Sequence, residues 1–252
     1  MVKGFYNLTS GMLSQGRRLD VVANNMTNIS TAGFKAEQYT DRTFDEVMAV
    51  RIGNKIKTPY LELPTYQAHI LAPDHLYTDF TQGAPEETNL PLDFCIQGEG
   101  FFAIQMWDGT TAYTRAGSFT LDNEGYLSLS ELGRVLDREG EPIQLPTDKL
   151  EVDAQGSLST EGGEYLATLG VYMFEDNGEL ERTPYGLFTG EGAQINEDAR
   201  IRHKMVERSN VSMVKEMVNM MATQRALQSA AQMSKIYDQV INRIVNDIGR
   251  LQ

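Results

Sequence analysis

Residues 227–251 read LQSAAQMSKIYDQVINRIVNDIGRL, and mostly apolar side chains recur there at gaps that alternate between three and four positions. The members of this C-terminal stripe are Leu227, Ala230, Ser234, Tyr237, Ile241, Ile244, Ile248 and Leu251. Such gaps place side chains along one face of a helix, and a repeat of about 3.5 residues is typical of coiled coils. Neither proline nor glycine occurs from Ser209 to Ile248. The sequence therefore predicts one long C-terminal helix, with Ser209 or Asn210 as its N-cap.

The beginning of the chain repeats this pattern. The N-terminal stripe has the same alternating gaps and consists of Phe5, Leu8, Met12, Gln15, Leu19, Val22, Met26 and Ile29. Gly4, Gly11 and Gly16 each weaken the helix by up to about 1 kcal/mol relative to alanine, so we expect it to need a partner surface. Gly33 is the expected positive-φ residue where this segment ends. The two helices either pack together, within or between subunits, or both lie on the core of the middle domain.

Between Leu92 and about Gly190 the apolar period changes to two. Runs such as Phe101–Met106 and Leu166–Phe174 end in turn sequences rich in Asp, Asn and Gly. Short strands with such turns are typical of an all-β barrel or sandwich. Upstream of this region, five prolines between residues 59 and 91 favour an extended connection over any long helix.

These patterns predict an α+β fold in which N- and C-terminal helices form a coiled-coil domain and an all-β domain lies between them. The expected boundaries are 1–34 for the N-terminal helix, 35–91 for the extended proline-containing connection, 92–205 for the acidic β-rich domain, and 206–252 for the C-terminal helix.

Charge is distributed unevenly along the chain. The formal net charge is −13, with −18 in residues 36–205, +3 in residues 1–35 and +2 in residues 206–252. An acidic centre argues against nucleic acid or an anionic membrane as the partner. Apolar runs all fall short of the roughly 18 residues of a membrane span. Polar residues interrupt the N-terminus, so we expect no cleaved secretory signal peptide.

Sequence motifs for chemistry are weak. Residues 98–103, GEGFFA, match a dinucleotide-binding fingerprint, but the residues that follow are strand-like, so a glycine bend between strands is the better interpretation. Cys95 is the single cysteine and is expected to be a small buried hydrophobic residue in a strand. His69, His75 and His203 have no metal-ligand spacing. We therefore expect no catalytic, cofactor-binding or metal-binding residues, and a protein that is not an enzyme.

Three blocks of sequence resemble one protein family. Residues 22–35 read VANNMTNISTAGFK; residues 96–102 and 113–119 read IQGEGFF and YTRAGSF; residues 207–211, 216–221 and 224–226 read ERSNV, EMVNMM and QRA. In this order they closely resemble the conserved blocks of the flagellar rod, hook and hook-associated proteins.

The resemblance implies a structural subunit of the flagellar basal-body rod in the periplasm, which polymerises into a helical tube, transmits torque and conducts exported proteins. It implies other rod subunits and copies of itself as partners, together with hook or other basal-body proteins and the flagellar type III export apparatus. Head-to-tail contacts that do not close into a ring would give such a filament. The short interval from Lys35 to Leu92 favours a proximal rod subunit, and the YTRAGSF and QRA blocks favour a distal one.

The residues expected at assembly interfaces belong to the two stripes, to the polar and turn residues after the first stripe, and to a second apolar strip at the start of the C-terminal helix. Asn24 and Asn25 are either solvated or hydrogen-bonded to a neighbouring subunit. The expected interface residues are Phe5, Leu8, Met12, Leu19, Val22, Asn24, Asn25, Met26, Ile29, Gly33, Phe34, Val211, Val214, Met217, Val218, Met221, Leu227, Tyr237, Ile241, Ile244, Ile248 and Leu251. Two other classes remain open: a coiled-coil adaptor carrying a ligand-binding β-barrel, and a secreted enzyme built on the β domain.

Overall fold

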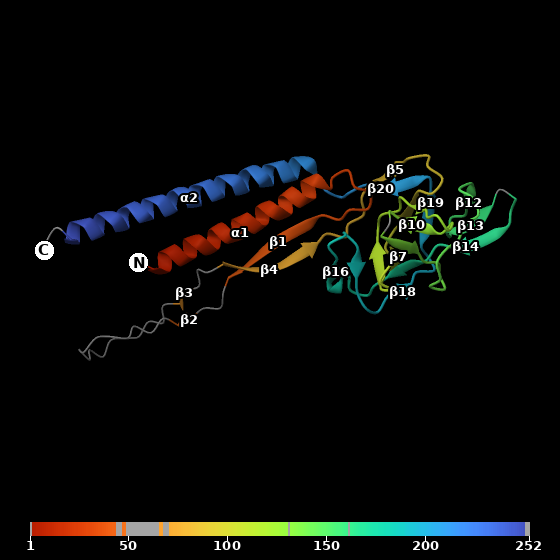
Figure 1. Ribbon diagram of the computed structural model, residues 1–252, viewed down its shortest axis with the longest axis horizontal. Coiled ribbons are helices and arrows are strands. Elements are labelled where there is room, and N and C mark those ends of the chain that lie inside the picture. The colour runs from red at the N-terminus through yellow and green to blue at the C-terminus, as the bar shows by residue number, and fades with distance from the viewer. Residues whose placement is uncertain are drawn as a thin grey trace. The chain divides into compact units, whose positions relative to one another are not determined.

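The computed structural model describes residues 2–43, 47–48, 66–67, 71–130, 132–160 and 162–249. The described chain begins with helix α1 (Val2–Thr27), continues through a mostly β middle, and ends with helix α2 (Met213–Gly249), as Figure 1 shows. This confirms the predicted α+β class with a helix at each end. The chain divides into two compact units: unit 1 is Met1–Asn24, Glu37–Tyr77 and Val214–Gln252, and unit 2 is Asn25–Ala36 and Thr78–Met213.

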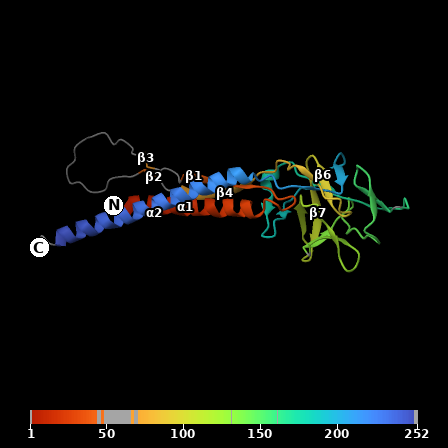
Figure 2. The same cartoon turned by 90° about the horizontal axis from the view of Figure 1, so that it is seen from above.

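The apolar stripes lie on the less exposed faces of the helices. On α1, Leu8, Met12 and Leu19 are half-buried and Val22 is buried, whereas Leu13, which lies off the stripe, is 58% exposed. On α2, the stripe from Leu227 to Ile241 is half-buried, whereas the next member, Ile244, is exposed. Figure 2 shows these long helices from above. The side chains of Phe5 and Ile248, and all of Leu251, lie outside what the structure describes.

Strands in unit 1 form small sheets. Strand β1 (Glu37–Thr43) pairs with β4 (Leu71–Thr78), and β2 (Val47–Met48) pairs with β3 (Tyr66–Gln67). These strands fall in the segment that the prolines predicted to be extended. His75 lies in β4, and His69 is outside the described residues.

Helix α1 is tied to β1 by side-chain hydrogen bonds. Ser14 Oγ donates to Asp41, Arg18 Nη2 forms an ion pair with Asp41 at 3.0 Å, and Asn24 Nδ2 donates to Glu37 at 3.3 Å. Residues 14 and 24 are about 15 Å apart along a helix, and residues 41 and 37 are about 13 Å apart along a strand. Because the two spans match, β1 runs antiparallel to α1 and bonds it at both ends of this interval.

Unit 2 contains a nine-stranded sheet among its described residues. Its strands are β7 (Phe101–Met106), β8 (Thr111–Thr114), β9 (Thr120–Leu121), β10 (Leu127–Leu129), β11 (Gly133–Val135), β15 (Val171–Met173), β16 (Glu181–Arg182), β17 (Phe188–Thr189) and β18 (Gln194–Ile195). Strand β7 is the centre: β8 pairs along one edge, while β15 and β11 pair with opposite ends of β7. All these pairs are antiparallel, so the predicted short strands and turns are present.

Smaller sheets complete unit 2. Strand β6 (Phe94–Gln97) pairs with β19 (Arg200–His203), β5 (Pro85–Glu87) pairs with β20 (Met205–Glu207), and β12 (Leu150–Val152), β13 (Ser157–Thr160) and β14 (Tyr165–Thr168) form a three-stranded sheet. The segment just before α2 is therefore part of the β structure and lies in unit 2. Cys95 lies buried in β6, as predicted.

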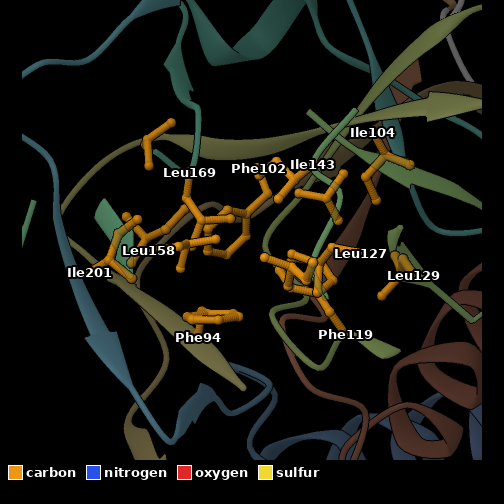
Figure 3. Close-up of a cluster of buried hydrophobic side chains, with 14 of the residues drawn as sticks. Phe94, Phe102, Ile104, Phe119, Leu127, Leu129, Ile143, Leu158, Leu169 and Ile201 are labelled. Atoms are coloured by element: carbon orange, nitrogen blue, oxygen red, sulfur yellow. The ribbon is translucent and has the colours of Figure 1, made fainter. Parts of the chain in front are cut away.

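A shared apolar core holds these sheets together. Figure 3 shows Phe94 of β6, Phe102 of β7, Leu158 of β13 and Ile201 of β19 among its members. Phe94, Phe102 and Leu158 are fully buried. The core explains why the apolar period of two continues through strands that belong to different sheets, because each sheet contributes one face to the same interior.

Two local predictions were wrong. The run 166–174 is not one strand, because Leu169 N donates to Gly156 O and Gly170 N donates to Leu136 O, so the chain changes partners between β14 and β15. Helix α2 begins at Met213 and not after Ser209 or Asn210. The Asn210 amide instead bonds Ala36 N, Asp79 O and Thr81 O, which removes it from any capping role.

Gly33 has φ +69°, as predicted, and a Cβ there would lie 2.2 Å from Ala116 N. Gly33→Ala should therefore lower the free energy of unfolding of unit 2 by about 2 kcal/mol or more, from backbone strain and overlap with main-chain atoms. Urea denaturation followed by far-UV circular dichroism measures this change. Gly162→Ala is the matched control, since the nearest atom to its Cβ is 3.6 Å away. An equal effect of both substitutions would contradict the close approach at Gly33.

Candidate functional site: a buried charge cluster that joins the three motifs

Three charged side chains from distant parts of the chain meet inside unit 2. Lys35 follows the turn after α1, Arg115 follows β8, and Glu207 ends β20. Lys35 Nζ lies 2.5 Å from Glu207 Oε1, and Arg115 Nη1 lies 3.2 Å from Glu207 Oε2. The side chains of Lys35 and Glu207 are each 1% exposed, and that of Arg115 is 5% exposed. One carboxylate thus serves two buried cations.

Backbone groups provide further partners for this charge cluster. Gly83 N donates to Glu207 Oε1 at 2.9 Å, Lys35 Nζ donates to Thr81 O at 2.8 Å, and Arg115 Nη2 donates to Gly98 O at 2.7 Å. Buried charges are tolerated only when hydrogen bonds replace their hydration. The segment 81–83 is therefore as much a part of the cluster as the three charged residues.

Close backbone approach allows this arrangement. Gly33 N donates to Glu207 O at 2.7 Å, and a Cβ at Gly83 would lie 1.9 Å from Arg208 O. Glycine at these two positions lets the turn before Lys35 and the segment 81–83 lie directly against the end of β20. The sequence places Lys35 within reach of Glu207 because Gly33 permits a tight turn two residues earlier.

The electrostatics of the cluster are dominated by burial. Burial lowers the pKa of the Lys35 ammonium, the carboxylate of Glu207 opposes this, and the nearby charge of Arg115 adds to it. Burial likewise lowers the pKa of the Arg115 guanidinium, again against Glu207. With all three groups ionised the cluster has one excess positive charge. Glu207 is consequently the group whose loss leaves the most unbalanced charge in the interior.

A second layer of contacts surrounds the cluster. The Arg182 guanidinium carbon lies 4.3 Å from the centre of the Phe34 ring, and Arg182 Nη1 donates to Lys35 O at 3.3 Å. Phe34 also packs with Ala36 and Val211 in a small apolar cluster. A cation within about 6 Å of an aromatic ring is attracted to it. These contacts hold the residues on both sides of Lys35.

Asn210 connects three chain segments by itself. Its Oδ1 accepts from Ala36 N at 2.8 Å, and its Nδ2 donates to Asp79 O at 2.7 Å and to Thr81 O at 3.1 Å. A primary amide has two donors and one acceptor carbonyl, so it can bridge backbone groups that face different ways. We call residues 33–36, 79–83, 115 and 207–211 the clasp.

The structure separates the predicted interface residues into groups. Gly33, Phe34 and Val211 belong to the clasp, and Asn25 is buried, which rules out the solvated interpretation for that residue. Asn24 is exposed but bonds Glu37 within its own chain. The stripe residues lie on α1 and α2, while Val214, Met217, Val218 and Met221 are exposed on α2.

Sequence reasoning missed Lys35, Arg115, Glu207 and Asn210 as a set. A signal was present, because each of the three quoted blocks contains one of these charged residues. Lys35 and Arg115 are positive, and Glu207 is negative. Charge alone could not pair them, since Lys35 and Glu207 are 172 positions apart.

Comparison with known proteins matches the same three regions. Residues 5–35 match the family described as "Flagella basal body rod protein", residues 95–160 match the "Flagellar hook protein FlgE/F/G D1 domain", and residues 202–247 match the "Flagellar basal body rod FlgEFG protein C-terminal". Each region contributes one member of the charge cluster, in the order Lys35, Arg115, Glu207.

Full-length relatives agree with this. The chain is 31% identical to the flagellar basal-body rod protein FlgF of Mesorhizobium japonicum over 88% of this chain and 87% of the relative. It is 29% identical to the rod protein FlgG of Borreliella burgdorferi over 88% and 89% of the two chains. The chain belongs to the flagellar basal-body rod protein family. It is a structural subunit of the rod, and relatives of both the FlgF and FlgG types match it.

The glycine-rich start of the segment GEGFFA lies between two strands. Gly98 and Gly100 form a positive-φ bend between strands β6 and β7, so GEGFFA does not precede a helix. Within the described ranges, no group of three potential metal ligands is assembled, and neither helix is long and apolar enough to cross a bilayer. His203 stacks on Phe94 and its Nε2 lies 2.6 Å from Pro91 O.

Glu207→Gln should strongly destabilise unit 2, because it keeps the shape of the side chain but leaves Lys35 and Arg115 without a counter-charge. Removing one partner of a buried ion pair costs about 3–5 kcal/mol. Urea denaturation would measure this loss in the free energy of unfolding. Glu86→Gln is the control, since the Glu86 and Arg208 side chains are 55% and 59% exposed and lie 3.4 Å apart. It should change stability by less than about 1 kcal/mol. A loss at Glu207 no larger than that at Glu86 would refute the role assigned to the cluster.

The buried Lys35 should make the free energy of unfolding rise with pH in the alkaline range. Its pKa in the folded state is lowered by burial, so it lies below the value of about 10.4 expected in the unfolded chain. Between these two values the unfolded chain binds more protons, and the free energy of unfolding rises with pH by up to about 1.4 kcal/mol per unit. Below the folded-state pKa this contribution is constant.

Comparison with Lys35→Met isolates that effect. Burial raises the pKa values of Tyr113 and Tyr172, so their ionisation in the unfolded chain lowers stability above about pH 10 in both proteins. The stability of wild type minus that of Lys35→Met should increase as pH rises toward 10, in pH-dependent urea titrations. Lys149→Met, at an exposed lysine, controls for the lost charge. A difference that falls with pH would show that Lys35 has a raised pKa.

Proposed function

We propose that this rod subunit polymerises through its terminal helices into a helical tube that transmits torque and conducts exported proteins. In that assembly the helices form coiled-coil contacts within and between subunits. The observation that carries the proposal is an uncovered apolar face on α2: Met217, Val218 and Met221 are 46%, 55% and 50% exposed. Further along the helix, Met233, Ile236 and Val240 are 60%, 54% and 48% exposed.

Val218, Met221 and Ile236 lie on the opposite side of α2 from the C-terminal stripe, and Met217, Met233 and Val240 lie between these two sides. At 3.6 residues per turn, Val218 and Leu227 are nine positions apart and therefore about half a turn apart around the helix. The stripe side is half-buried or buried, as at Thr223 and Leu227. One apolar face thus serves the folded chain and the other remains for a neighbour, because a helix that is apolar on two sides needs two partner surfaces.

The clasp supports a mechanical role. The chain passes between its two units after residues 24, 36, 77 and 213. Asn210 lies three residues before the passage at 213. Its amide bonds Ala36, at the passage after residue 36, and Asp79, two residues after the passage at 77. Three of the chain segments that enter unit 2 are thus hydrogen-bonded to one another just inside it. A subunit that transmits torque requires its chain to be fixed at several such points in place of a single flexible linker.

We also propose the proximal rod as the location, with the distal rod as the alternative. The short interval from Lys35 to Leu92 supports the proximal position. The expected partners are other rod subunits, further copies of this chain, hook or other basal-body proteins, and the flagellar type III export apparatus. Electron microscopy of basal bodies from a deletion strain discriminates the positions. Loss of a proximal subunit removes the rod above its base, whereas loss of a distal subunit leaves a shortened rod.

Val218→Glu should block polymerisation and leave the monomer folded, because the side chain is exposed in the monomer and buried in the assembly. Burying a valine contributes about 1.5–3 kcal/mol, so the critical concentration should rise at least about tenfold. Sedimentation at increasing protein concentration measures this. Tyr165→Glu, at a 63% exposed residue of unit 2, is the control and should assemble normally. Unchanged sedimentation of Val218→Glu would argue against α2 as the assembly surface.

A further inference from the structure

Strand β19 and the residue after it present three exposed basic side chains. Arg200, Arg202 and Lys204 are exposed, and Ile201 between them is buried in the core of unit 2. Alternation along a strand sends the two arginines to the same, outward side. We call these three residues the basic row. It stands out because unit 2 has 10 basic and 25 acidic residues, a net charge of −15.

The charges of the basic row are not neutralised within the part of the chain that the structure describes. Within the described parts of the chain, none of its three members forms an ion pair. Arg202 Nε donates to Gln97 Oε1 at 3.2 Å, which holds the side chain in place without neutralising it. Glu197 and Asp198 precede the row in sequence and do not pair with it. Two positive charges therefore lie on β19 and a third directly follows it.

A recess elsewhere on unit 2 is lined by acidic side chains. It is lined by Phe174, Glu175, Asp176, Leu180, Gly190, Glu191, Gly192 and Gln194 and encloses about 340 Å³. Gln194 donates to Glu175 at 3.4 Å and Gly178 N donates to Asp176 at 2.7 Å, but none of the three carboxylates has an ion pair within the described residues. Gln194 of the recess lies in β18, and Figure 1 shows β18 and β19 at different places in unit 2.

We propose that the basic row of one copy binds the acidic recess of a second copy. The recess suits an arginine, since Phe174 and Leu180 can contact the methylene stem while the carboxylates bond the guanidinium. Because the row and the recess are different surfaces, the contact is heterologous and repeats from copy to copy. The inference rests on the proposed assembly and adds to it a second contact, made by unit 2 and not by the helices.

A charge-swap series tests the pairing. One variant reverses the row (R200E, R202E and K204E), a second reverses the recess (E175K, D176K and E191K), and a third carries both sets. Each single reversal places like charges opposite one another and should raise the critical concentration at least about tenfold. The third variant should return toward wild type, and so should a mixture of the first two. If neither reversal changes assembly, or both do and the combination fails to recover, the pairing is wrong.

Cross-linking separates this contact from the helical one. A zero-length carboxyl-to-amine reagent is applied to a mixture of light and heavy isotope-labelled full-length protein that carries Val218→Glu, in which helix-mediated assembly should be blocked. Mixed-label peptides joining Lys204 to Glu175, Asp176 or Glu191 would support the contact even if wild type failed to polymerise. Their absence at high protein concentration and low salt, or links only within one label, would overturn it. The links should decrease in about 1 M salt, where charges are screened beyond roughly 3 Å.

Discussion

Glu207 places one buried carboxylate between two buried cations, and the rest of unit 2 is organised around it. Lys35 comes from the N-terminal part of the chain, Arg115 from its centre, and Glu207 from just before α2. None of these charges can be buried at low cost until the other segments are in place. Closing unit 2 therefore requires contacts between residues 92 and 172 positions apart, which join its segment 25–36 to the end of β20 in the same step.

The two units use apolar side chains in different ways. Unit 2 encloses its phenylalanines, so that Phe94, Phe102 and Phe188 are fully buried between its sheets. Helix α2 does the reverse, because several of its methionines and valines are exposed. Methionine is adaptable and is frequent at surfaces that bind partners. The arrangement suits a subunit whose body is complete alone and whose helices are completed by neighbours.

Much of the fold follows from periodicity. Alternating gaps of three and four located both helices, and a period of two with Asp, Asn and Gly turns located the strands around β7. Periodicity could not show where one extended run changes partners, as at Leu169 and Gly170, because that depends on which distant carbonyl is within reach. Asn210 was misread as a helix cap for a related reason: its amide meets stronger competition from Ala36 and Asp79, which only the tertiary fold brings near.

The charge cluster also explains why the three family blocks contain charged residues where an apolar core would be at least as stable. Apolar burial is non-directional, and replacing a buried ion pair by well-packed apolar residues is often neutral or stabilising. Arg115, Lys35 and Gly83 donate hydrogen bonds to one carboxylate, while Asn210 accepts one from Ala36 N and donates one to Asp79 O. These bonds fix orientation as well as position. In the proposed rod, unit 2 has to bear load without internal shear. Apolar contacts can slide with little loss of contact area, whereas these bonds break when donor and acceptor shift, so directional bonding inside unit 2 suits a torque-bearing subunit.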